Sequence, residues 1–140
     1  MSHARTWPVR TLSVLALSAA ALALPATTAS AADQLTLVRA TAAGDHVEVQ
    51  VRYRCEELMG TDTLAVSLAN TEDGGVYSAS TAPECDGSWH ETTVATARGA
   101  GPAARAGTDA VITASLGIGP DPQVFPTAST RSTLTLRSPR

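Results

Sequence analysis

Apolar and polar residues alternate along several short segments of the chain. The clearest alternation runs from His46 to Cys55, where every second residue is apolar: Val47, Val49, Val51, Tyr53 and Cys55. Successive side chains of an extended chain point to opposite faces, so a period of two predicts a strand with one buried face. The same period recurs in residues 64–69, 110–116 and 133–136. These four segments are therefore predicted to be strands.

Residues that fit a pleated sheet, among them threonine, valine and tyrosine, are enriched in three further segments: 34–41, 75–80 and 89–97. Turn-forming residues separate the predicted strands, in segments 43–45, 70–75, 99–107 and 117–126. No segment after residue 31 shows the apolar period of an amphipathic helix. The sequence therefore predicts a chain of about seven short strands.

Short strands separated by turns are typical of all-β domains, and here they predict an immunoglobulin-like antiparallel β-sandwich of about seven strands. Because successive strands of such a sandwich run in opposite directions, their connections alternate between its two ends. The second, fourth and sixth connections then share one end: residues 56–62, 81–87 and 117–128. We name the end formed by these three loops the loop pole.

The chain begins with a different pattern. A basic start precedes an uncharged apolar run, Leu12–Leu24, and the small residues Ala29-Ser30-Ala31 follow. This order is that of a secretory signal peptide and its cleavage site. A transmembrane helix needs about 20 apolar residues, which is longer than this run. We therefore expect residues 1–31 to be a signal peptide and residues 32–140 to form a single secreted, extracellular domain, free of the membrane after cleavage.

The charge of the expected mature domain excludes some classes of partner. Residues 32–140 hold 13 acidic residues and 8 arginines, with no lysine, which gives a net charge of −5. Proteins that bind nucleic acids need a basic face, and anionic membranes attract basic segments. The sequence therefore argues against both as partners.

The two cysteines, Cys55 and Cys85, both lie in the expected mature domain. In an oxidising compartment an even number of cysteines indicates a disulfide, and only one pairing exists here. A metal-binding or catalytic thiol pair is the alternative, but the C-x-x-C spacing is absent. A bridge would close a loop of about 31 residues, worth about 3–4 kcal/mol through the reduced entropy of the unfolded chain.

Two motifs surround these cysteines: Tyr53-Arg54-Cys55, and Cys85-Asp86-Gly87 followed by His90. The pattern resembles a family of small secreted actinobacterial proteins classed as a domain of unknown function. The resemblance extends over most of Leu35–Leu136, although few residues are specific to it. It implies an extracellular, immunoglobulin-like, disulfide-bonded domain and implies no activity.

Catalytic motifs are scarce. After residue 31 the only histidines are His46 and His90, and Ser88 and Asp86 lie near His90 in the sequence. The nucleophile motif G-x-S-x-G is absent, as are the phosphate-binding, dinucleotide-binding and zinc-protease motifs. We therefore expect a protein that is not an enzyme and uses no cofactor.

Acidic residues gather at the loop pole, and its three loops contain no arginine or histidine: Glu56, Glu57, Asp62, Glu84, Asp86 and Asp121. Carboxylates from several loops are the ligands that Ca²⁺ prefers. The alternative is a solvated acidic surface that keeps the protein soluble. No linear calcium-binding motif is present, so the carboxylates are candidates only, and no metal is assigned.

The same loops carry four apolar residues: Leu58, Met59, Val124 and Phe125. These side chains either cover the end of the core or form a docking patch ringed by acids. Three functions remain open. The first is a binding module for an unknown extracellular protein or cell-envelope component. The others are a secreted protease inhibitor, with the proline-rich sixth connection as its loop, and a Ca²⁺-stabilised structural domain of the cell envelope.

Overall fold

A computed structural model describes residues 32–139 of the protein, so the expected signal peptide, residues 1–31, lies outside the described residues. The described chain is all-β, as predicted, with one short 3₁₀ helix, η2 (Glu57–Met59). Its seven strands are β1 (Gln34–Ala43), β2 (His46–Arg54), β3 (Thr63–Asn70), β4 (Val76–Thr81), β5 (Trp89–Ala100), β6 (Asp109–Ile118) and β7 (Phe125–Thr135). All neighbouring strands pair antiparallel.

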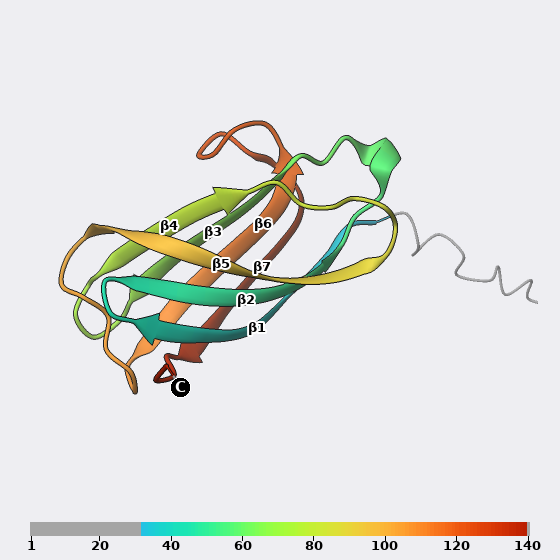
Figure 1. The fold of residues 1–140 in the computed structure, drawn as a ribbon. Helices are drawn as coiled ribbons and strands as arrows, with labels where there is room; N and C mark the ends of the chain where they lie inside the picture. Colours follow the sequence, from blue (N-terminus) through green and yellow to red (C-terminus); the bar gives the residue numbers. More distant parts are fainter. Residues whose placement is uncertain (1–31, 140) are drawn as a thin grey trace, which may run out of the picture.

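The strands form one hydrogen-bonded sheet in the order β1-β2-β5-β4-β3-β6-β7. Strand β4 joins its two halves because it pairs with β3 on one side and, over a shorter stretch, with β5 on the other. The sheet folds over, so that β1 and β2 cross in front of β6 and β7 (Figure 1). Arg137, after β7, closes it through backbone hydrogen bonds of 2.9 Å to Ala40 and Ala42 of β1.

The alternating residues of the predicted strands form the core. Val47, Val49 and Val51 of β2 are completely buried. They share the core with the apolar residues of β3 and β6: Leu64, Val66, Leu68, Ala110, Ile112, Ala114 and Leu116. Within residues 32–139, two aromatic side chains are buried in this core, Tyr53 and Tyr77. The alternation therefore identified the buried faces of β2, β3 and β6 correctly.

Strand β7 differs from the prediction. The alternation indicated a strand only over residues 133–136, whereas β7 begins at Phe125 and pairs with β6 along its whole length. The missed part is rich in serine and threonine, and none of its residues is buried. Without a buried face a strand leaves no alternation in the sequence. The sixth connection is consequently shorter than predicted and spans residues 119–124.

Tyr77 fixes the long connection between β5 and β6, at the end opposite the loop pole. The ring is completely buried. Its hydroxyl accepts a hydrogen bond of 2.6 Å from the backbone N–H of Ala104 and donates one of 3.4 Å to the carbonyl of Pro102. A loop without regular structure is thereby attached to the core through one side chain.

We expect the substitution Tyr77→Phe to lower the free energy of unfolding by about 1–3 kcal/mol, because it leaves the buried N–H of Ala104 without an acceptor. Urea unfolding of the two proteins measures the difference. The matched control is Ser80→Ala, which removes an exposed hydroxyl from the same strand and should change stability by less than about 0.5 kcal/mol. Equal losses in the two variants would contradict the role assigned to the Tyr77 hydroxyl.

Candidate functional site: the loop pole

The predicted disulfide joins two of the three loops of the loop pole. Cys55, directly after β2, is bonded to Cys85 in the β4–β5 loop, with their Cα atoms 4.6 Å apart. Two hydrogen bonds of 2.9 Å support the bridge, from Gly87 N–H to the Cys55 carbonyl and from Glu84 N–H to the Tyr53 hydroxyl. Figure 1 shows the β2–β3, β4–β5 and β6–β7 loops at the same end of the molecule, as the strand directions predicted.

Asp62 connects the β2–β3 loop to the β6–β7 loop. Its carboxylate accepts hydrogen bonds from the N–H of Gly119, at 3.0 Å, and from the hydroxyl of Thr63, at 2.9 Å. Its own N–H donates to the carbonyl of Gly117, at 3.0 Å. Asp62 therefore joins the β2–β3 loop to the β6–β7 loop through hydrogen bonds, a role that its acidic side chain alone did not indicate.

Asp33 is a buried carboxylate at the loop pole that the sequence patterns did not identify. It is 7% exposed, and it accepts hydrogen bonds from the hydroxyls of Thr61, at 2.6 Å, and Thr127. The N–H of Glu56 lies 3.4 Å from it. Asp33 thus links the start of the described chain to the β2–β3 loop and to β7. It precedes the first strand, where no periodic pattern covers it, so the sequence offered no signal.

Basic side chains on the strands contact three of the acidic side chains, which the loop sequences did not suggest. The imidazole of His90, on β5, lies between two carboxylates, with Nδ1 3.3 Å from Glu84 and Nε2 2.8 Å from Asp86. Arg54, on β2, lies 3.6 Å from Glu56. The absence of arginine and histidine from the loops was therefore misleading, because Arg54 and His90 reach the loop carboxylates from the adjoining strand ends.

The contact with His90 changes the acidity of Asp86. A hydrogen bond from the imidazole, assisted by one from the N–H of Ser88, lowers the pKa of the Asp86 carboxyl. The imidazole also stacks on Tyr53, with ring centroids 5.6 Å apart. Both ring nitrogens of His90 face carboxylates, so the imidazole is not directed at the Ser88 hydroxyl as a nucleophile's base would be.

The six candidate carboxylates do not converge. Asp62 faces the backbone of the β6–β7 loop, whereas Glu84 and Asp86 flank His90. Within residues 32–139 no group of three or more histidine, cysteine, aspartate or glutamate side chains is placed to hold a metal ion. The geometry therefore gives no support to the Ca²⁺ ligand set considered from the sequence.

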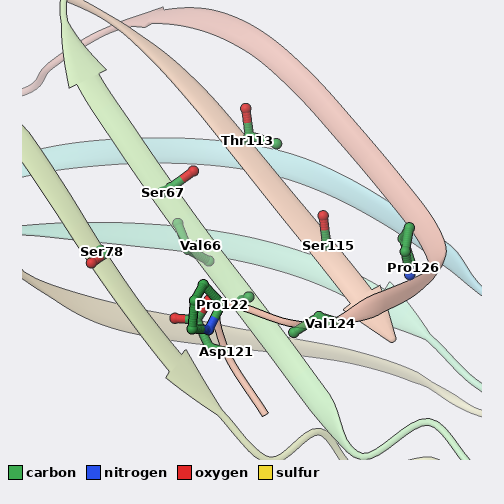
Figure 2. A pocket seen from close by; sticks show the side chains of 10 residues that line it. Val66, Ser67, Ser78, Thr113, Ser115, Asp121, Pro122, Val124 and Pro126 are labelled. Atoms are coloured by element: carbon green, nitrogen blue, oxygen red, sulfur yellow. The ribbon is translucent and has the colours of Figure 1, made fainter. Parts of the chain in front are cut away.

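Asp121 lies over the sheet, away from the other carboxylates. The β6–β7 loop bends over the outer face of β3, β4 and β6 and encloses a shallow pocket of about 180 Å³ (Figure 2). Asp121, Pro122 and Val124 form its loop side. Hydroxyl groups from the three strands line its sheet side: Ser67, Ser78, Thr113 and Ser115. A hydrogen bond of 2.8 Å from Gln123 N–H to the Pro120 carbonyl closes the bend.

Apolar side chains are exposed at the loop pole. Leu58 is 99% exposed, Phe125 77% and Met59 43%, whereas Val124 is half-buried. Ile118, which sequence reasoning missed because it ends a strand with a buried face, is 42% exposed. Ile118 connects the two loops, since a Cβ atom on Gly60, next to Met59, would lie 3.9 Å from its Cδ1. The exposed apolar residues of the loop pole therefore include one that the sequence patterns did not identify, Ile118.

The comparisons with known proteins gave no match, whether to family models, to curated proteins or to solved structures. The family resemblance around the cysteines thus stays a prediction. The disulfide is typical of proteins in oxidising compartments such as the extracellular space. None of the helices in the described part of the chain has the length and apolar character needed to cross a membrane.

We expect His90→Ala to raise the pKa of Asp86 towards its ordinary value. Because that pKa is lowered in the folded protein, Asp86 contributes stability above its unfolded pKa and loses it as the pH falls through the folded value. The variant should therefore lose less stability on acidification below about pH 4. Carboxyl NMR titration measures the pKa, and urea unfolding across the same pH range measures the stability.

The control for this titration is His46→Ala, which removes the other described histidine, at the opposite end of β2. It should leave the pKa of Asp86 unchanged. If the two variants gave the same Asp86 titration curve as the native protein, the contact between His90 and Asp86 would not exist in solution.

Proposed function

We propose that this protein is a secreted, non-enzymatic binding module that uses the loop pole to hold another extracellular protein or a protein of the cell envelope. The supporting observation is the position of the exposed apolar side chains. Of the seven large ones exposed within residues 32–139, four belong to adjoining segments of this pole: Leu58, Met59, Ile118 and Phe125. Apolar side chains clustered on a surface are a common mark of an interaction site.

The exposed apolar side chains of the loop pole are not explained by packing in the core. Leu58 on η2 contributes almost nothing to the core, since it is 99% exposed. The loops that carry the patch are nevertheless fixed, by the disulfide, by Asp62 and by Asp33. A surface that is already ordered loses little conformational entropy on binding. Rigid loops that present apolar groups are therefore better suited to docking than to covering the core.

Charge indicates the chemistry of the partner. Exposed carboxylates accompany the apolar patch at the loop pole: Glu57, Asp62, Glu84 and Asp86. A partner with an apolar centre bordered by lysine and arginine would complement this surface. We therefore favour a protein partner with a basic rim over nucleic acid or an anionic membrane, which the net charge of −5 for residues 32–140 would repel.

The strand order supports an immunoglobulin-like interpretation of the fold. In that fold one sheet has the order A-B-E-D and the other contains C, F and G. With strands lettered along the chain, the observed order β1-β2-β5-β4-β3-β6-β7 reads A-B-E-D-C-F-G. Two features differ from antibody domains: β4 pairs with both halves, and the disulfide joins the end of β2 to the β4–β5 loop rather than to β6.

The protease-inhibitor hypothesis has less support. It relied on a stiff, exposed β6–β7 loop, but this loop bends back over β3 and β4 and places Pro122 in the wall of a pocket (Figure 2). Residues 119–123 form a bend and a turn, so the loop is exposed but does not present an extended segment to an enzyme. Titration of the protein against secreted serine proteases tests this alternative directly.

We expect the double substitution Leu58→Ser and Phe125→Ser to weaken partner binding at least tenfold, because it removes the two most exposed side chains of the patch. Affinity capture from culture supernatant with the native protein identifies the partner by mass spectrometry. Calorimetry with the purified partner then gives the dissociation constants. The variant should keep its thermal stability, since exposed positions contribute less than about 0.5 kcal/mol each.

The matched control is Val76→Ser, an exposed apolar residue, 44% accessible, at the start of β4 and thus at the opposite end of the sheet. This variant should bind the partner as the native protein does. Tight binding by the Leu58 and Phe125 variant, or an equal loss in the control, would show that the partner docks elsewhere.

A further inference from the structure

The carboxylate of Asp33 is buried without a positive partner. Its hydrogen bonds come from neutral donors, the hydroxyls of Thr61 and Thr127 and the N–H of Glu56. Among residues 32–139 no arginine or histidine side chain forms an ion pair with it. Arg54 pairs at 3.6 Å with Glu56, whose N–H faces Asp33, so this arginine already serves another carboxylate. A buried carboxylate in this position lacks a counter-charge.

The expected processing of the chain would create a positive group beside this carboxylate. The small residues Ala29-Ser30-Ala31 predict cleavage of the Ala31–Ala32 peptide bond. Hydrolysis by a signal peptidase consumes one water, leaves a carboxylate on Ala31 and leaves an amine on Ala32, which takes up a proton at neutral pH. Ala32 is exposed and directly precedes Asp33, so few bonds separate the new charge from the buried one.

We propose that the α-ammonium group of Ala32, formed when residues 1–31 are removed, is the counter-charge of the buried Asp33 carboxylate and completes the loop pole. In the precursor the same nitrogen is a neutral amide and supplies no charge. Asp33 links the β2–β3 loop, through Thr61, to β7, through Thr127. Processing therefore strengthens the attachment between the segments that carry Leu58 and Phe125.

This inference rests on the expected cleavage site and not on the identity of any partner. Around the Asp33 carboxylate, β7 and the β2–β3 loop contribute the neutral hydroxyls of Thr127 and Thr61. The third donor, the N–H of Glu56, belongs to a residue whose carboxylate pairs with Arg54. The ammonium is thus the group near Asp33 whose charge changes between about pH 7 and pH 9.

The experiment compares the chain that begins with a free amine at Ala32 with the same chain extended by Gly-Ser before Ala32. At pH 6 the free-amine form should melt about 2–5 °C higher, and the difference should vanish above about pH 9.5, where the amine is neutral. In the Asp33→Asn background both forms should melt alike at every pH. The control Asp121→Asn removes a carboxylate of the pole that lies over the sheet and should preserve the difference.

A second measurement does not depend on stability. The pH dependence of acylation of the Ala32 amine gives its pKa, which should be higher in the native free-amine form than in Asp33→Asn. Two results would overturn the proposal. One is that the free-amine chain and the Gly-Ser-extended chain, both with Asp33, melt at the same temperature at pH 6. The other is that the Ala32 amine has the same pKa with Asp33 as with Asn at this position. N-terminal sequencing of the protein exported from cells must also begin at Ala32; any other start would overturn it. Partner capture plays no part in these results, so they stand apart from the proposed function.

Discussion

The fold depends on burying the alternating face of β2 against β3 and β6 with side chains that are mostly small. Valine, alanine and leucine dominate the core, and within residues 32–139 the only buried aromatic side chains are Tyr53 and Tyr77. Small side chains fill the space between the halves of a folded sheet, but they provide little contact area where strands end and loops begin. The ends of this molecule must therefore be held by other interactions.

Polar groups and the disulfide provide those interactions, and they differ at the two ends. At one end the hydroxyl of Tyr77 holds the β5–β6 connection. At the loop pole the Cys55–Cys85 bridge, Asp62 and Asp33 each join two segments that are distant in the sequence. Acidic side chains here serve as acceptors for backbone N–H and hydroxyl groups. Asp62 and Asp33 thus act as structural acceptors that join loops.

Because polar contacts and the bridge fix the loops, their apolar side chains are not needed for stability. Leu58, Met59, Ile118 and Phe125 remain exposed on segments that cannot easily rearrange to hide them. This combination of ordered backbone and accessible apolar surface is the physical basis for the proposed binding role. The pocket beneath the β6–β7 loop, lined by hydroxyl groups, lies on the adjacent face of the sheet (Figure 2).

The sequence by itself determined the all-β class, the position of most strands, the single possible cysteine pairing and the end of the molecule at which it lies. These features follow from local rules, since a buried strand face repeats every second residue and antiparallel strands alternate their connections. Strand β7 was largely missed because this rule needs a buried face, and the exposed part of β7 has none.

Only the tertiary structure decided the use of individual polar side chains. Asp33 is held by Thr61 and Thr127, which lie 28 and 94 residues along the chain and are brought to it by packing across strands. His90 and Arg54 lie within four residues of Asp86 and Glu56, but only the strand geometry turns these side chains towards each other. Asp121 turns away from the other carboxylates. The sequence placed the charges at one end of the molecule, and the fold determined which of them meet.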